Sequence, residues 1–131
     1  MIVVDSSAWI ELLRGRGTTV ALKLKMIVQQ QDDQVLVGDI VLLEVLQGAR
    51  DDQQAARLER DLRQYPIVTM LDVNLAIRAA SNYRTLRQKG ATIRKAADLI
   101  IGTYCLEFDH QLLHNDRDFD PMVTHLGLQA A

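Results

Sequence analysis

The sequence holds a single cysteine and no long apolar run. Cys105 cannot form a disulfide within the chain, which suits a reducing cytoplasm. No stretch approaches the ~18 consecutive apolar residues of a membrane-spanning helix. The chain opens on a strand-like run at 2–4 instead of a secretory leader, and it has no glycine-rich phosphate loop that would favour a nucleotidase. We therefore expect a cytoplasmic protein without a membrane segment.

The length and composition are those of one domain. The chain has 131 residues, of which 48% are hydrophobic, enough for one sizeable core. Internal repeats, linkers and low-complexity tracts are all missing. We expect a single domain over 1–131.

Apolar runs alternate with helical patterns along the chain. Strands are predicted at 2–4, 35–37, 67–70 and 112–113, with a weak final one at 126–128. Helices are predicted at 8–14 (capped by Ser6 or Ser7), 20–30, 40–47, 53–64, 73–89 and 96–108. This alternation predicts an α/β fold of three layers, in which helices cover both faces of a mostly parallel sheet of four to five strands.

Charge is distributed unevenly. From Val73 to Ala97 there is no acid, whereas residues 98–120 hold six acids and one base. A basic segment followed by an acidic one suits an enzyme that attracts a polyanion and binds a cation. A solvated helix face beside an acidic loop explains the pattern equally well.

Four acids lie where acids are uncommon. Asp5 and Asp116 follow apolar strands, whereas Glu44 and Asp98 lie inside apolar helical runs. An ionised carboxylate in such surroundings is costly unless a positive charge offsets it. Converging acids without matching bases are what a hard divalent cation requires. Taken singly, each has a structural alternative: Asp5 could be a helix cap, and Asp116 competes with Asp118 and Asp120 in one acidic loop.

The segments around these acids resemble, in order and spacing, the acidic motifs of PIN domains. They are Val4-Asp5-Ser6-Ser7-Ala8-Trp9-Ile10, Leu43-Glu44-Val45-Leu46-Gln47-Gly48, Ala97-Asp98-Leu99-Ile100-Ile101-Gly102 and Leu112-Leu113-His114-Asn115-Asp116-Arg117-Asp118-Phe119. The chain is most similar to the VapC-type toxin ribonucleases of type II toxin–antitoxin systems. The likeness runs from residue 2 to the final Leu126-Gly127-Leu128.

The resemblance implies a role for particular residues. Asp5, Glu44, Asp98 and Asp116 match the quartet that holds Mg²⁺ or Mn²⁺ and carries catalysis. Ser6 matches a hydroxyl residue beside the first acid, and Asp118 is expected close to the ligands without binding the metal itself. His114 departs from the family, which commonly has Thr or Ser there; it faces the site or simply packs.

The implied activity is hydrolysis of RNA phosphodiester bonds by metal-activated water, with Arg94 and Lys95 holding phosphates. The implied partners are RNA, a cognate antitoxin and a second copy in a homodimer. Trp9, Leu12 and Leu13 are candidates for an apolar groove that binds the antitoxin, although core packing explains Leu12 and Leu13 as well.

Rival functions fit the sequence less well. A phosphatase of the haloacid-dehalogenase kind needs a second Asp two residues after the first, and position 7 is Ser. A receiver-like signalling module needs strands ending in a phosphorylatable Asp and in Lys, and neither is evident. A PIN-like domain that binds RNA or a partner without catalysis stays the main alternative, against which the intact quartet argues.

Overall fold

The computed structural model describes all 131 residues. Its sheet has four strands in the order β3-β2-β1-β4, all parallel. The strands are β1 (Ile2–Val4), β2 (Val35–Gly38), β3 (Ile67–Val68) and β4 (Gln111–Leu113). The central strand β1 pairs Val3 with Leu36 on one side and with Leu112 on the other. Every residue of β1 and β2 is buried, as expected for parallel strands that are covered on both faces.

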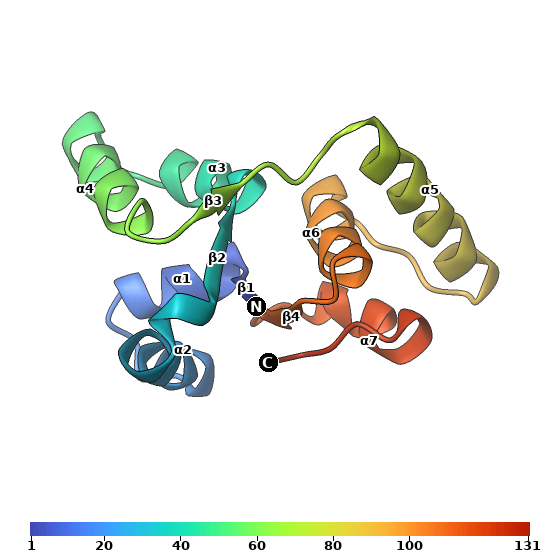
Figure 1. Cartoon of the computed structure of the whole chain (residues 1–131), viewed down its shortest axis with the longest axis horizontal. Coiled ribbons are helices and arrows are strands. Elements are labelled where there is room, and N and C mark those ends of the chain that lie inside the picture. The colour runs from blue at the N-terminus through green and yellow to red at the C-terminus, as the bar shows by residue number, and fades with distance from the viewer.

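Seven helices cover the sheet, and Figure 1 shows α1 to α4 on one side of it and α5 to α7 on the other. The first group is α1 (Ser6–Leu13), α2 (Thr19–Gln30), α3 (Asp39–Gln47) and α4 (Asp52–Leu62). The second is α5 (Val73–Gln88), α6 (Ala96–Glu107) and α7 (Asp120–Leu126). Two short 3₁₀ turns, η1 (Asp32–Gln34) and η2 (Arg117–Phe119), precede β2 and α7. The predicted three-layer α/β fold is therefore confirmed.

Two close approaches between elements depend on glycine. A Cβ atom on Gly38, the last residue of β2, would lie 2.3 Å from Cε of Met70. A Cβ atom on Gly102 of α6 would lie 2.4 Å from Sδ of Met122 on α7. Met70 and Met122 are both fully enclosed and have little room to withdraw. Gly38 lets Met70, which follows β3, pack against the end of β2. Gly102 lets Met122 of α7 pack against α6, the helix that carries Asp98.

The chain after residue 119 differs from the sequence-based prediction. The predicted final strand at 126–128 is wrong: Leu126 is the last residue of α7, no strand forms at 127–128, and only Ala130 makes an isolated parallel bridge to Leu112. Helix α7 escaped prediction because its few apolar residues follow a run rich in aspartate that was interpreted as a loop. Gly127 ends it in the left-handed conformation, with φ of 79°.

Other boundaries moved by a few residues. Helix α1 begins at Ser6, and its N-cap is Asp5, not either serine. Strand β3 stops at Val68, two residues short of the prediction, because the backbone N–H of Met70 donates to Oδ1 of Asp39 at 3.1 Å. None of the helices has both the length and the apolar character that a membrane crossing requires.

Candidate metal centre

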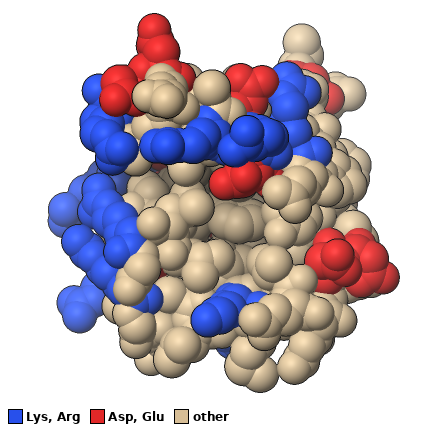
Figure 2. All heavy atoms as spheres, turned by 90° about the vertical axis from the view of Figure 1, so that its left-hand side faces the viewer, with Lys and Arg blue, Asp and Glu red and all other residues tan.

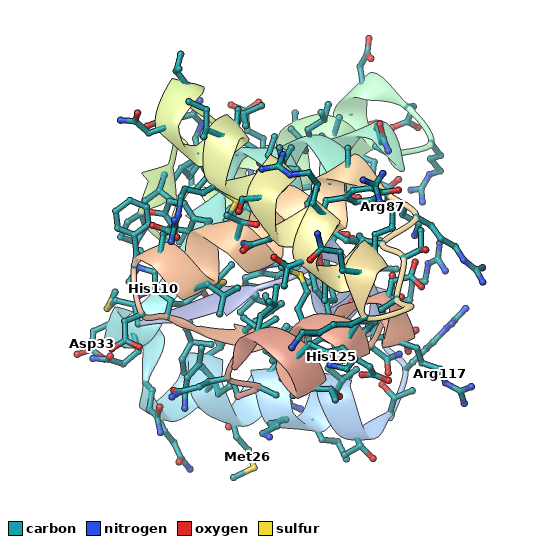
Figure 3. The ribbon with its side chains drawn as sticks, turned by 90° about the vertical axis from the view of Figure 1, so that its right-hand side faces the viewer. Met26, Asp33, Arg87, His110, Arg117 and His125 are labelled. Atoms are coloured by element: carbon teal, nitrogen blue, oxygen red, sulfur yellow. The ribbon has the colours of Figure 1, made fainter.

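The four predicted acids come from four different elements. Asp5 and Asp116 follow the carboxyl ends of β1 and β4, Glu44 lies on α3 and Asp98 in the first turn of α6. In open parallel sheets, sites form at the carboxyl ends of the strands. Figure 3 shows this edge on the side of Arg117, whereas His110, which precedes β4, lies on the opposite side.

Asp5 lies deepest in the site and is 2% exposed. Its Oδ2 accepts hydrogen bonds from the backbone N–H of Ser7 at 3.1 Å and from the Ser7 hydroxyl at 2.5 Å. Its Oδ1 is buried and has no hydrogen-bond partner. Burial raises the pKa of Asp5, and the hydrogen bonds from Ser7 partly oppose that rise. Asp5 therefore caps α1 with one carboxylate oxygen and leaves the other without a hydrogen-bond partner, available to a metal ion.

The two serines after Asp5 have different contacts. The hydroxyl of Ser6 donates to Oε1 of Glu44 at 3.1 Å, which holds a half-buried carboxylate of α3 against the start of α1. Burial raises the pKa of Glu44, and the Asp5 charge raises it further. The hydroxyl of Ser7 donates to Asp5 and also accepts from the backbone N–H of Asn115 at 2.9 Å. The sequence predicts a role for Ser6 but not for Ser7, because nothing in the sequence distinguishes two adjacent serines after Asp5.

Asp98 has the most perturbed carboxyl group of the site. Its side chain is 2% exposed, and its buried Oδ2 has no hydrogen-bond partner. Burial, followed by the nearby charges of Asp5 and Asp116, raises its pKa from 3.8 to about 7. Glu44 adds to this effect, whereas Lys95 opposes it. The charges of Asp5, Glu44 and Asp116 thus all act on Asp98, as expected if the four acids face a common site.

The loop after β4 supplies two more carboxylates of interest. Carboxylate oxygens of Asp98, Asp116 and Asp118 all lie within 4.8 Å of one another. Oδ1 of Asp116 accepts from the backbone N–H of Asp118 at 2.9 Å, which fixes the turn that brings the two together. Asp118 therefore lies as close to Asp98 as a metal ligand would, a position nearer than the sequence suggested.

His114 contacts the site through the backbone. Its Nδ1 accepts from the backbone N–H of Asp116 at 3.3 Å, and its ring centroid lies 4.9 Å from that of Phe119. It also lines a polar hollow of about 240 Å³ together with Asn115, Asp116, Arg117 and Asp120. His114 thus packs and, as an acceptor, orients the residue that carries the fourth acid.

These residues fit a hard divalent cation. Two buried carboxylate oxygens, Oδ1 of Asp5 and Oδ2 of Asp98, have no donor, and a buried acceptor without a donor is uncommon in proteins. Only oxygen ligands converge, and the acids outnumber the bases, as Mg²⁺ or Mn²⁺ requires. One acid of this cluster is paired: Nζ of Lys95 lies 3.6 Å from Oδ2 of Asp116.

Basic side chains border the acidic centre. Arg94 and Lys95 lie in the loop before α6 and are both exposed, and Arg94 forms no ion pair. Figure 3 shows Arg87 and Arg117 extending from the same side of the molecule. On the face that includes α4, Figure 2 shows a band of Lys and Arg side chains along one edge and across the upper part. A negative polymer would meet positive charge before reaching the acids.

Known proteins share this sequence pattern and fold. Residues 2–122 match the profile of the PIN domain. The VapC ribonuclease Mb1587 of Mycobacterium bovis and ribonuclease VapC11 of Mycobacterium tuberculosis are each 30% identical over 131 residues, covering 100% of this chain and 98% of the relative. The toxin–antitoxin complex VapBC2 of Rickettsia felis, bound to a DNA fragment from its promoter, contains a similar fold. It matches with a TM-score of 0.77 and 17% identity, over 100% of this chain and 98% of the other. By profile, full-length relatives and fold, this chain belongs to the PIN-domain family.

Proposed function

We propose that this protein is a Mg²⁺- or Mn²⁺-dependent endoribonuclease and the toxin of a type II toxin–antitoxin module. The observation that carries the proposal is the cluster of Asp98, Asp116 and Asp118, whose carboxylate oxygens lie within 4.8 Å of one another, together with bare buried oxygens on Asp5 and Asp98. The charges of Asp5, Glu44 and Asp116 all act on Asp98, which supports a site shared by these four acids. The names of the full-length relatives, VapC ribonucleases, support the same reaction.

The residues divide the work as follows. Asp5, Asp98 and Asp116 hold the cation, and Asp118 is close enough to add an oxygen. When bound, Mg²⁺ or Mn²⁺ would activate a water for attack and offset the negative charge that develops on the phosphate oxygens. Ser6 fixes Oε1 of Glu44, which leaves Oε2 to accept a proton from water and orient it. Arg94 and Lys95 bind backbone phosphates of single-stranded or looped RNA, whose bases can splay apart.

The test is cleavage of a single-stranded RNA by the purified protein. We expect cutting with Mn²⁺ or Mg²⁺, none with EDTA, and none of a DNA of the same sequence. Asp98→Asn should abolish cutting. Asp72→Asn is the matched control, because Asp72 caps α5 through Leu75 and is not one of the converging acids. RNA binding without cutting under any metal would instead support the non-catalytic alternative.

The antitoxin is proposed to bind an apolar groove between α1, α3 and α4. The groove encloses about 160 Å³, and its lining includes Ile10, Leu13, Val45 and Leu58. Of the three residues suggested by the sequence, only Leu13 lines it. Trp9 is buried against Tyr65 with ring centroids 5.6 Å apart, and Leu12 packs against the core. An amphipathic segment of the antitoxin fits such a groove.

A partner encoded beside this gene tests the antitoxin proposal. The product of a small neighbouring reading frame should copurify with the wild-type chain and suppress its growth arrest. Leu13→Glu should lose both effects, because a charge would be buried in the groove. Leu22→Glu, at a 55% exposed position on α2 outside the groove, should retain them. Copurification of Leu13→Glu at wild-type yield would place the partner elsewhere.

The homodimer is proposed to form through the outer face of α5. Leu71, Val73 and Ile77 are 43%, 76% and 63% exposed within seven residues. Figure 1 shows α5 as the outermost helix on its side of the sheet. An exposed cluster of this kind is typical of a protein–protein contact, and a second copy presents the same apolar face in a two-fold arrangement.

A further inference from the structure

Lys95 is the one basic residue whose side chain forms an ion pair within the acidic centre. The other four ion pairs of the chain lie outside it, for example between Glu59 and Arg63 on α4. Lys95 is the last residue before α6, and its Nζ reaches across to Oδ2 of Asp116 in the loop after β4. The pair therefore joins two segments that both carry candidate metal ligands.

The ion pair between Lys95 and Asp116 is weak enough for either residue to change partner. The Nζ–Oδ2 distance of 3.6 Å is longer than a good hydrogen bond, and the Lys95 side chain is 61% exposed. Lys95 caps α6 without a side-chain hydrogen bond, and on this helix only the charge of Asp98 attracts it. An exposed lysine pair of this length is weak and costs little to break.

Lys95 also occupies only part of the acidic centre. It pairs with Asp116 at the rim, whereas Oδ1 of Asp5 and Oδ2 of Asp98 stay unpartnered below. A cation that binds these deep oxygens also draws on Asp116, whose oxygen lies within 4.8 Å of those of Asp98 and Asp118. Lys95 and the metal thus compete for one carboxylate and repel each other at short range.

We propose that Lys95 is an internal counter-ion that holds Asp116 in the absence of RNA and transfers to an RNA phosphate, so that RNA and metal bind cooperatively. The inference rests on the proposed nuclease function. By reciprocity, an RNA that attracts Lys95 away from Asp116 raises the metal affinity, and the metal raises the RNA affinity by the same factor. Metal occupancy of the site then rises when substrate is present.

The neighbouring Arg94 provides the contrast. It is one residue away, is also exposed and basic, and forms no ion pair with a carboxylate. Arg94 is already free to meet a phosphate, so its contribution to RNA binding carries no penalty to the metal. The difference on which the proposal depends is the pair with Asp116.

Calorimetric titration with Mn²⁺ alone, at fixed pH, tests the first half of the proposal. Lys95→Met keeps the apolar stem and removes the charge, and should bind Mn²⁺ about three- to tenfold more tightly than the wild type. Arg94→Met, the matched control, should stay within about twofold of it. Equal or weaker Mn²⁺ binding by Lys95→Met overturns the inference.

The second half is tested by repeating the titration with a single-stranded oligodeoxynucleotide present. The oligonucleotide should raise Mn²⁺ affinity more in the wild type and in Arg94→Met than in Lys95→Met. Equal enhancement in all three proteins overturns the coupling. A wild type that binds Mn²⁺ and cuts RNA while Lys95→Met behaves identically refutes this inference alone. A wild type that binds no Mn²⁺ refutes the nuclease function as well.

Discussion

The hydroxyl of Ser7 accepts a hydrogen bond from the backbone N–H of Asn115 at 2.9 Å, although 108 residues separate the two in sequence. The same hydroxyl donates to Asp5. One small side chain therefore sets the distance between the acid after β1 and the loop that carries Asp116. Because a first acid held at the wrong distance from the fourth cannot share a cation with it, Ser7 is a positioning residue.

Alanine replacements should distinguish the structural roles of Ser7 and Ser6. Ser7→Ala removes two hydrogen bonds and should lower the free energy of unfolding by about 1–2 kcal/mol, measured by urea denaturation in EDTA. It should also weaken Mn²⁺ binding. Ser6→Ala frees only the half-buried Glu44 and should cost less stability. Equal losses in the two variants would contradict the bridging role of Ser7.

Asp5→Asn should separate catalysis from folding. An amide oxygen can still accept the hydrogen bonds from Ser7, whereas the buried charge that raises the pKa of Asp98 disappears. We expect an unchanged or higher melting temperature in EDTA. RNA cleavage should fall by about two orders of magnitude or more, because mutating residues that only support the ligands already costs about 10- to 100-fold, and Asp5 is proposed as a ligand itself. Expression of the wild-type chain should arrest bacterial growth, and that of the variant should not. A variant that unfolds would make Asp5 chiefly a helix cap.

The stability of the metal-free protein should fall as pH rises. Burial and neighbouring acids raise the pKa of Asp98 to about 7 in the folded protein, against an ordinary value of 3.8. The folded state therefore binds more protons than the unfolded state between these values, and stability is lost as pH rises through that window. Melting in EDTA should show this trend between about pH 4 and 7, and Asp98→Asn should flatten it. The increase in stability caused by Mn²⁺ should depend on pH in the opposite way. It should grow as pH rises, because only the ionised carboxylate binds the cation.

The oligomeric state should depend on α5. Val73→Glu places a charge on a position that is 76% exposed in the single chain and central to the proposed dimer face. Light scattering should then report a monomer, with unchanged thermal stability of the domain at low concentration. Val123→Glu on α7, at a less exposed apolar position, should stay dimeric. A dimer that survives Val73→Glu would place the interface on another surface.

The sequence was most informative where side chains contradict their surroundings. Glu44 and Asp98 inside apolar helices, and Asp5 after a β-branched strand, identify themselves because ionised groups rarely lie there without a reason. Likewise, β1 and β2 are recognisable because parallel strands buried on both faces are uninterrupted apolar runs.

What the sequence did not indicate depends on tertiary contacts. The bridging role of Ser7 exists only once β4 has paired with β1, and nothing local separates Ser7 from Ser6. Asp118 and Asp120 appear equivalent in sequence, yet only Asp118 is turned toward Asp98, by the hydrogen bond from its own N–H to Asp116. Helix α7 is not recognisable in the sequence because it has few apolar side chains. One of them, Met122, becomes a core residue only through its packing against Gly102 on α6.

The first strand lies between the second and the last, with Val4 beside Leu113. A chain emerging from the ribosome thus carries Asp5 and Glu44 well before Asp98 and Asp116 can join them. Until β4 is made, it lacks one of the two partner strands of β1 as well as the fourth acid. Nuclease activity should therefore begin only after translation has passed the loop at Asp116, so that a nascent chain cannot attack RNA in the machinery that makes it.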